Sequence, residues 1–337
     1  MRIILEDRHI SRLFQPLTLT RHTADLRIGI LTIKEKWEKI TGLPIFFNAD
    51  PARGDVVIPA NIIPTKSTAG KIIEAFSSGK MPQNVITLKH CWHLLELNAA
   101  EIENDFDLLT GSRTSFPVSD TNKVSGKIFV EEGVEMEHTI INAASGPVYI
   151  GKNATVMEGS LIRGPFAMGE GSVIKMGGKM YPATTLGPFC IAGGEIKNSI
   201  LIGYSNKAHD GYLGDSIIGE WCNLGAGTSN SNLKNTGGII SVQNDNELIQ
   251  LGNKAGTIMG DYSRTAINTS LNTACVIGIC CNIFGQGMVN RMPSFTWGNE
   301  KYELDKALRD IEQWKAFKKM KLDKKEVDLL TKIYQEQ

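Results

Sequence analysis

The sequence lacks the features that mark several common classes of protein. Its 337 residues carry 36 Lys and Arg against 36 Asp and Glu, so the formal net charge is zero. A neutral chain argues against a nucleic acid or an anionic membrane held by bulk electrostatics. No apolar run approaches the roughly 20 residues needed to span a bilayer, and Ile3–Leu5 runs directly into charged residues rather than into a signal peptide. We therefore expect a cytoplasmic protein with no nucleic-acid or membrane partner.

The sequence does contain a repeat of six residues. From Ile150 onward, every sixth position as far as Leu186 holds a large aliphatic residue or Met, and a small residue stands two positions before most of them. The seven positions are Ile150, Val156, Ile162, Met168, Ile174, Met180 and Leu186. A period of six fits neither an α-helix nor an alternating strand. It is typical of a hexapeptide parallel β-helix, in which the aliphatic side chains point into the coils.

The repeat returns later in the chain, which favours a long solenoid over a chance pattern in a Gly-rich loop. Further matches are Ile218, Leu224, Leu271, Ile277, Ile283 and Val289. The 34 glycines and the low aromatic content of 7% also suit this architecture. The six cysteines show no spacing typical of a metal site, and most are expected to be small buried residues of solenoid strands in a reducing compartment. Those five are Cys190, Cys222, Cys275, Cys280 and Cys281.

We predict an α/β N-terminal domain, a left-handed parallel β-helix and C-terminal helices. The boundaries are residues 1–110 for the α/β domain, 111–126 for a polar linker, 127–292 for the β-helix and 293–337 for the tail. Within the first domain, the expected strands are Arg2–Leu5, Val56–Ile58 and Val85–Leu88, and the expected helices are Ile28–Ile40 and Leu94–Leu109.

Two segments outside the regular repeat have expected roles. Residues 233–254 break the period, so we expect a protruding loop or hairpin that reaches a neighbouring subunit. In the tail, apolar spacing predicts a helix from Leu304 to Phe317, and Asp323 with Glu326 resembles a capping box before a second helix. The tail is expected to cover the open end of the solenoid or to pack against a neighbour.

A lone histidine marks the segment that carries chemistry. His209 lies between Ile202 and Ile218, where the period of six slips, so its side chain is expected at a coil corner rather than in the core. Imidazole, with an ordinary pKa of about 6.5, can accept a proton from an amine or hydroxyl at neutral pH. A single histidine is more often structural than catalytic, so composition alone leaves its role open.

The surrounding segment, Gly193–Asn232, resembles the acetyltransferase domain of the bifunctional enzymes that acetylate glucosamine-1-phosphate and then make UDP-N-acetylglucosamine. That family has the pattern E-x-K, a His twelve residues after the Lys, then x-x-Y-x-G-D, and later N-x-G-A-G-T and N. The matching positions are Glu195, Lys197, His209, Tyr212, Gly214, Asp215, Asn223, Gly225, Ala226, Gly227, Thr228 and Asn232.

The resemblance implies roles for these side chains. His209 would be the general base that deprotonates the sugar amine before it attacks the thioester of acetyl-CoA. The substrate-binding residues would be Glu195, Lys197, Tyr212, Asn223 and Asn232, with the Lys197 charge on the phosphate. Coenzyme A would contact Ala226, Gly227, Arg264 and Ala266. Asn232 would meet the acyl end of coenzyme A or, alternatively, hold the amine and the developing oxyanion.

One departure from the family concerns the sugar phosphate. The family has an Arg before a Pro upstream of the Lys, whereas this chain has Tyr181–Pro182. Lys179 or Arg163 would take the place of that Arg, and the spacing does not decide between them. The identity of the sugar phosphate is therefore open, with glucosamine-1-phosphate as the first expectation.

Residues 4–29 resemble the start of sugar-phosphate nucleotidyltransferases. Ser11–Arg12 and Pro16–Thr18 match the family pattern, in which the Arg would contact the triphosphate. The glycine-rich phosphate loop does not match, because Asp7, Arg8 and Ile10 stand where the family has Gly or Ala. The Lys that follows a Pro in the family is also missing.

Three interpretations of the N-terminal half follow. It is a divergent uridylyltransferase, a domain that binds a nucleotide-sugar without turnover, or a structural remnant. An active domain would use Ser11 and Arg12 on the nucleotide and would require Mg²⁺. The metal ligands are unknown from the sequence; Asp105 and Asp107 are candidates, against the alternative of a solvated helix end.

The whole chain resembles an alternative bacterial form of the bifunctional family with a shortened N-terminal half. We expect acetyl-CoA-dependent N-acetylation of an amino-sugar phosphate, with or without uridylyl transfer, by a homotrimer whose sites lie between solenoids. The alternatives are a sugar-phosphate nucleotidyltransferase with a regulatory solenoid and a non-catalytic trimer that binds a nucleotide-sugar.

Overall fold

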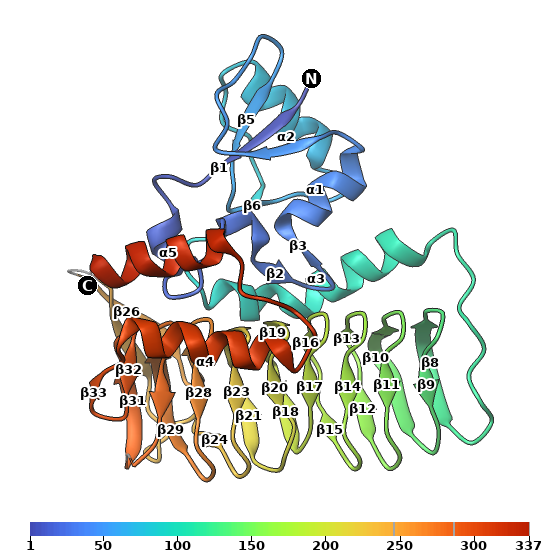
Figure 1. The fold of residues 1–337 in the computed structure, drawn as a ribbon. Helices are drawn as coiled ribbons and strands as arrows, with labels where there is room; N and C mark the ends of the chain where they lie inside the picture. The colour runs from blue at the N-terminus through green and yellow to red at the C-terminus, as the bar shows by residue number, and fades with distance from the viewer. Residues whose placement is uncertain (245–246, 286, 337) are drawn as a thin grey trace.

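The chain forms a long parallel β-solenoid with an α/β unit on one side and two C-terminal helices beside it (Figure 1). The computed structural model describes residues 1–244, 247–285 and 287–336. The solenoid extends from β8 (Lys123–Val130) to β32 (Thr296–Trp297). The predicted fold class, an α/β domain with a left-handed parallel β-helix and C-terminal helices, is confirmed.

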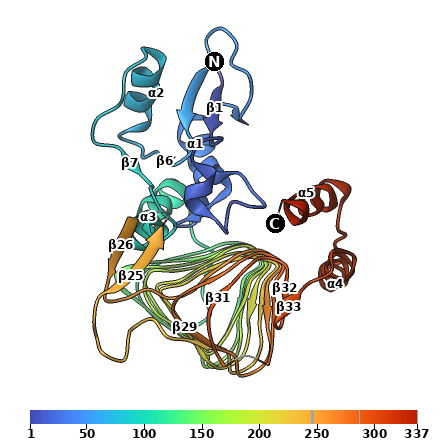
Figure 2. The ribbon, with the colours of Figure 1, turned by 90° about the vertical axis from the view of Figure 1, so that its left-hand side faces the viewer.

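Successive coils pair in parallel and build three faces, which we number in chain order (Figure 2). Face 1 contains β12 (Leu161–Arg163), β15 (Lys179–Met180), β18 (Glu195–Lys197), β21 (Tyr212–Gly214) and β24 (Ser229–Asn230). Face 2 contains β13 (Phe166–Met168), β16 (Thr184–Leu186), β19 (Ile200–Gly203), β22 (Ile217–Glu220) and β27 (Ile258–Met259). β8, β10 (Ile140–Ile150), β29 (Ser270–Ile277) and β31 (Met288–Met292) run from face 1 into face 2.

Face 3 completes each coil. Its strands are β9 (Glu135–Met136), β11 (Thr155–Val156), β14 (Val173–Ile174), β17 (Ile191–Ala192), β20 (Asn206–Lys207), β23 (Asn223–Leu224), β28 (Arg264–Thr265), β30 (Asn282–Ile283) and β32, after which β33 (Glu300–Lys301) pairs antiparallel. Every residue of the seven-position repeat from Ile150 to Leu186 lies in the interior cluster and is at most 2% exposed. Each large aliphatic side chain buried in this way contributes about 1.5–3 kcal/mol. The predicted repeat is therefore the core of the solenoid.

The N-terminal unit is built on a three-stranded parallel sheet. β1 (Ile3–Glu6) lies between β4 (Ile45–Phe47) and β5 (Val56–Pro59). The remaining elements are η1 (Ser11–Phe14), η2 (Thr23–Asp25), β2 (Arg27–Ile28), β3 (Leu31–Thr32), α1 (Ile33–Thr41), β6 (Ile62–Ile63), α2 (Ala69–Ser77), β7 (Ile86–Thr87) and α3 (His93–Thr110). The predicted strands near residues 3, 56 and 86 and the helix Leu94–Leu109 are confirmed.

The predicted helix Ile28–Ile40 is wrong in its first part. β2 and β3 pair antiparallel around a turn at Gly29, whose φ is +75°, and α1 begins only at Ile33. Thr32 and Glu35 form a capping box that fixes this start. The apolar spacing continued across the turn, so periodicity alone placed the helix too early. α2 was not predicted.

Face 2 is the surface on which the N-terminal unit rests. Its outward row is largely apolar and runs through Tyr149, Ala167, Thr185, Ile200, Ile217, Ile258 and Val276. Ile200 and Ile217 join the core of the α/β unit, and Ala167 packs in a cluster with Ile102 and Phe106 of α3. The α/β unit and the solenoid therefore pack directly against each other through shared apolar clusters.

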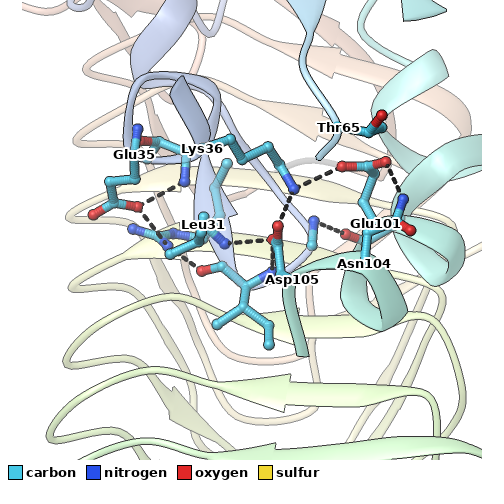
Figure 3. Close-up of polar contacts among 12 residues, drawn as sticks. Leu31, Glu35, Lys36, Thr65, Glu101, Asn104 and Asp105 are labelled. Carbon is cyan, nitrogen blue, oxygen red and sulfur yellow. Dashed lines mark hydrogen bonds and ion pairs between the residues drawn. The ribbon is translucent and has the colours of Figure 1, made fainter. Parts of the chain in front are cut away.

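Buried charges fasten α3 to the rest of the α/β unit (Figure 3). Lys36 Nζ lies 2.6 Å from Glu101 Oε2 and 2.5 Å from Asp105 Oδ1, and all three side chains are at most 2% exposed. Asp105 Oδ2 accepts hydrogen bonds from the backbone N–H groups of Ile30 and Leu31, at 2.8 and 3.0 Å. Burial raises the pKa of Asp105, although Lys36 opposes this shift. The interpretation of Asp105 as a metal ligand or a solvated helix end is therefore wrong.

The C-terminal tail covers an edge of the solenoid and not its open end. α4 (Leu304–Ala316) and α5 (Lys324–Gln335) pack on residues that follow face 2 in several coils. These solenoid residues are Trp221, Tyr262, Ile279, Cys280 and Phe295. Both predicted helices and the capping box of Asp323 with Glu326 are confirmed. The expected end cap is wrong, because the helices pack on the apolar and aromatic side chains of this edge.

Residues 233–254 contain the predicted hairpin. β25 (Ile240–Asn244) pairs antiparallel with β26 (Glu247–Gly252), while Asp245 and Asn246 lie outside the described residues. Figure 2 shows the hairpin beside α3 of the same chain. All six cysteines are free and buried, which confirms the expected burial of the five in the solenoid. Within the described ranges, no helix is both long and apolar enough to span a bilayer.

Replacement of Lys36 by Met should destabilise the protein by about 3–5 kcal/mol, because two buried carboxyl groups lose their cation. Chemical denaturation monitored by circular dichroism gives the free energy of unfolding. Lys34→Met on the same helix is the control, since Lys34 pairs with Glu38 at 3.4 Å on the exposed surface and should contribute less than about 1 kcal/mol. A Lys36→Met protein as stable as the control would contradict the assigned role of this cluster.

Candidate functional site

His209 lies where the chain turns from face 3 into face 1. We call residues 208–211 the His209 corner; it connects β20 with β21, and the His209 side chain is exposed. The corner is stacked closely on Gly194 of the preceding coil, where a Cβ atom would lie 2.9 Å from the carbonyl oxygen of His209. On the other side, the N–H of Gly227 donates to the carbonyl of Asp210 at 3.0 Å. The backbone is therefore fixed while the imidazole faces outward, as the phase slip predicted.

Face 1 brings three of the predicted side chains into one row. Lys179 is in register with Glu195, and Glu195 is in register with Tyr212. These three side chains alternate with interior residues, so they point outward on adjoining coils. Lys197, two positions after Glu195, is in register with Gly214. Tyr212 thus follows the His209 corner directly, with Glu195 one coil away and Lys179 two coils away.

Tyr212 belongs to a polar network that reaches the far end of face 1. Asn232 Nδ2 donates to the hydroxyl of Tyr212 at 3.1 Å and also to Asp215 Oδ2. Asn198 Nδ2 donates to the other oxygen of Asp215 at 2.6 Å. Burial raises the pKa of Tyr212, and the Asp215 charge acts in the same direction. The phenol therefore stays protonated over a wide pH range and can donate a hydrogen bond to a ligand.

The residues expected to hold coenzyme A continue along the same edge in the next coils. Gly227 touches the His209 corner through its hydrogen bond to Asp210. The carbonyl of Ala226 accepts from the N–H of Asn268 at 2.7 Å, and a Cβ atom on Gly225 would lie 2.6 Å from Ala266. Asn223 stands just before this corner on face 3. The structure thus places Asn223, Ala226, Gly227 and Ala266 together beside the His209 corner.

Arg264 is separated from this edge by the C-terminal tail. Its side chain lies on face 3, and its guanidinium stacks on Trp314 of α4 at 5.0 Å. The residue is 5% exposed, and Nη1 donates to the carbonyl of Tyr262 at 3.3 Å. Burial lowers the pKa of Arg264. In this arrangement the guanidinium contacts α4 and is not open to a ligand phosphate.

Lys179 and Arg163, the two candidate cations for the sugar phosphate, lie on different coils. β15, which carries Lys179, pairs directly with β18, which carries Lys197. Arg163 is on β12, one coil further away. Both side chains are exposed. Lys179 is therefore nearer to the strand of Lys197, whereas the sequence spacing alone left the choice open.

A buried carboxylate, that of Asp7, lies where the resembled family has its glycine-rich phosphate loop. Asp7 follows β1, and its oxygens accept from the N–H and hydroxyl of Thr23 at 2.8 and 3.0 Å and from Asn48 Nδ2 at 2.8 Å. His22 Nε2 lies 3.2 Å from Asp7 Oδ1. Burial disfavours the charged carboxyl, but these partners outweigh it and lower the pKa of Asp7. A carboxylate held in its charged form at this position disfavours the approach of a phosphate group.

Arg12 is directed elsewhere, into a cavity of about 270 Å³ between the two units. Ser11 offers its backbone carbonyl to the hydroxyl of Thr18 at 2.5 Å. The cavity is lined by the α/β unit, the solenoid and the hairpin. Its charged and polar residues include Arg12, Glu96, Asn198, Asp215, Lys254 and Arg291. Asp215 therefore touches both the Tyr212 network and this cavity.

The described residues contain no cluster of side chains suited to a metal ion. Among these residues, no group of three or more His, Cys, Asp or Glu side chains is arranged to hold an ion. Of the two candidates, Asp105 is engaged by Lys36. Asp107 is exposed and pairs with Lys127 at 2.7 Å. Among the described residues, neither carboxylate therefore belongs to a cluster that could hold Mg²⁺.

Comparisons with known proteins agree with both resemblances. Residues 2–80 match the family model described as sugar nucleotidyl transferase. A bifunctional sugar-1-phosphate nucleotidylyltransferase/acetyltransferase of Sulfurisphaera tokodaii is 30% identical over 201 residues, covering 59% of this chain and 45% of that protein. The chain is related to these bifunctional proteins.

Archaeal proteins named bifunctional protein GlmU are also similar. The protein of Methanococcus maripaludis strain S2 is 27% identical over 261 residues, which cover 75% of this chain and 59% of that protein. The protein of Methanocaldococcus jannaschii is 34% identical over 97 residues, or 29% of this chain and 24% of that protein. The chain thus spans about half the length of these relatives, or less.

Sequence reasoning missed the interior and supporting residues of the site. The sequence motif includes Asp215 without a role for it, and it does not include Asn198. Both carry positive φ angles, 49° and 45°, at the turns between face 1 and face 2. Asn and Asp are enriched in this conformation, so their place before each face 2 strand was the available signal.

The pH dependence of the free energy of unfolding tests whether Asp7 stabilises the folded protein. Because its pKa is lower in the folded state than in the unfolded state, Asp7 stabilises the protein above about pH 4 and loses this effect as the pH falls further. Asp7→Asn should therefore lower the free energy of unfolding at pH 7, and the difference from wild type should shrink towards pH 2. Exposed Asp50→Asn is the control. A difference that does not change with pH would contradict this assignment.

Proposed function

We propose that the chain is an acetyl-CoA-dependent N-acetyltransferase that acts on an amino-sugar phosphate, with glucosamine-1-phosphate as the preferred substrate. The observation that carries the proposal is the exposed His209 beside the row of Lys179, Glu195 and Tyr212. This arrangement offers a proton acceptor, a cation for a phosphate and hydrogen-bonding groups for sugar hydroxyls. The names of the bifunctional relatives support the same kind of chemistry.

The proposed reaction needs one base and no covalent enzyme intermediate. The amine nitrogen of the sugar attacks the thioester carbonyl, and a neutral imidazole nitrogen of His209 accepts the proton that the amine loses. The resulting C–N bond replaces the C–S bond, and coenzyme A leaves as a thiolate that takes up a proton. The products are the N-acetylated sugar phosphate and free coenzyme A. Glu195 and Tyr212 then serve to orient the sugar ring.

The hydrogen bonds of the Asn232 side chain favour one of the two roles expected for this residue. Its Nδ2 group donates to Tyr212 and Asp215, so the amide oxygen is the atom that it can offer to a substrate. An oxygen accepts a hydrogen bond from an amine but does not stabilise an oxyanion. We therefore assign Asn232 to the sugar amine.

A homotrimer is the proposed assembly, with face 1 turned towards a second copy. Faces 2 and 3 carry the N-terminal unit and the C-terminal helices (Figure 2). Face 1 has exposed apolar side chains at Ile140, Leu161, Tyr181 and Met288. Exposed apolar groups on a flat sheet favour association. A neighbouring solenoid on this face would enclose the His209 edge and exclude water from it.

Substitution of His209 by Ala should reduce the rate of acetyl transfer to glucosamine-1-phosphate by roughly a hundredfold or more, because the amine loses its proton acceptor. Release of thiol from acetyl-CoA measures the rate. His138 is a matched control, since it is also an exposed histidine at a solenoid turn, with a φ of 53° that Asn tolerates. His138→Asn should retain wild-type activity. Equal rates for wild type and His209→Ala would refute the proposal.

Nucleotidyl transfer is the second candidate function, because residues 2–80 match the sugar nucleotidyl transferase family. The position of Asp7 opposes it at the usual phosphate loop. Arg12 remains exposed and faces the cavity between the units. If this candidate is correct, the nucleotide must therefore bind without the glycine-rich loop.

Release of pyrophosphate from UTP, with N-acetylglucosamine-1-phosphate and Mg²⁺, tests the second candidate separately. From the charge of Asp7 we expect no release above background for wild type. Calorimetric titration with UTP distinguishes binding without turnover from no binding. If pyrophosphate appears and Arg12→Ala lowers its rate at least about tenfold, the N-terminal half is a uridylyltransferase and our expectation is wrong.

A further inference from the structure

Lys207 is a cation inside the solenoid. Its side chain is 0% exposed and lies in the interior row of face 3. The other members of this row are Met136, Val156, Ile174, Ala192, Leu224, Thr265 and Ile283. Lys is rarely buried completely unless its charge has a partner. Ala192, its neighbour in register, is the smallest residue of the row and leaves space for the longer chain.

The ammonium group of Lys207 binds the backbone of the His209 corner. Nζ donates to the carbonyl of His209 at 2.5 Å and to the carbonyl of Asp210 at 3.1 Å. Burial lowers the pKa of Lys207 to about 8, while the charge of Asp210 opposes the shift. At neutral pH the group is still mostly protonated, so both contacts are charge-assisted hydrogen bonds.

Two other corners between faces 3 and 1 hold the carbonyl of their first residue with a hydroxyl side chain. Ser160 donates to the carbonyl of Met157 at 2.7 Å, and Thr269 donates to that of Ala266 at 2.8 Å. Gly211 occupies the corresponding place before β21. Its φ is +122°, and a Cβ atom there would lie 2.2 Å from the carbonyl oxygen of Thr228. The His209 corner therefore cannot carry this hydroxyl, and Lys207 instead holds the carbonyls of its next two residues, His209 and Asp210, from the interior.

We propose that Lys207 is a positioning residue for His209. From inside the coil it fixes the carbonyls of residues 209 and 210, so that the imidazole projects from a rigid corner towards the substrate edge. A base held in one orientation reacts faster than one that samples several. The statement that His209 acts as the base rests on the proposed function, whereas the ordering of the corner does not.

Lys207→Met tests the proposal, because Met has a similar length and no donor. Ile174→Met is the matched control, since it places the same side chain two coils away in the same interior row. The kcat of Lys207→Met for acetyl transfer should fall at least about tenfold, with KM values for both substrates within about threefold. The melting temperature should change little, because the loss of two hydrogen bonds and the removal of a buried charge act in opposite directions. Ile174→Met should keep the wild-type kcat.

Hydrogen exchange followed by mass spectrometry gives a readout that does not need activity. Amides in residues 208–212 of Lys207→Met should exchange at least about tenfold faster than in wild type, while those of other corners should not change. Lys207→Gln retains a donor on a chain one atom shorter and should be intermediate in both measurements.

The outcomes separate this proposal from the proposed function. Wild-type protein without acetyl transfer would refute the function and leave the exchange data to test Lys207. Unchanged kcat and exchange in a folded Lys207→Met protein would overturn the positioning role. Failure of both Lys207 variants to fold would also overturn it, because Lys207 would then support the whole coil and not one corner.

Discussion

The parallel hydrogen-bond ladder between successive coils is the constraint on which this structure depends. It fixes the side chains of face 1 at the spacing between strands, about 4.8 Å, so that Lys179, Glu195 and Tyr212 stand in one row. The same stacking compresses the corners until only glycine fits at Gly194 and Gly211. The backbone of the His209 corner is held by this stacking from outside and by the ammonium group of Lys207 from inside.

The N-terminal unit uses the solenoid as a platform. Its apolar core continues into the outward residues of face 2. Within the unit, Lys36 of α1 binds two buried carboxyl groups of α3 (Figure 3). Asn98 extends this connection to Thr185 on the solenoid. The unit is thus fixed to the solenoid through face 2, and the turn after its first strand is held by the buried carboxylate of Asp7.

Much of the fold was predictable because the period of six reports directly on the interior of a β-solenoid. Every position of the first repeat is buried, and the motif from Glu195 to Asn232 placed the candidate site at one edge. The start of α1 was not predictable from periodicity, since a glycine turn at Gly29 lies inside an apolar run. The contact between Arg264 and α4 joins segments far apart in the chain, so no local pattern could show it. Lys207 was hidden because its sequence position gives no sign that its side chain points inward.

A crystal structure of the protein with coenzyme A and glucosamine-1-phosphate tests the central claim most directly. We predict both ligands at the edge between faces 1 and 3, with the sugar amine at about 3 Å from an imidazole nitrogen of His209 and a second copy of the chain closing over face 1. Ligands bound only in the cavity lined by Arg12, or a His209 corner that contacts neither molecule, would contradict the account.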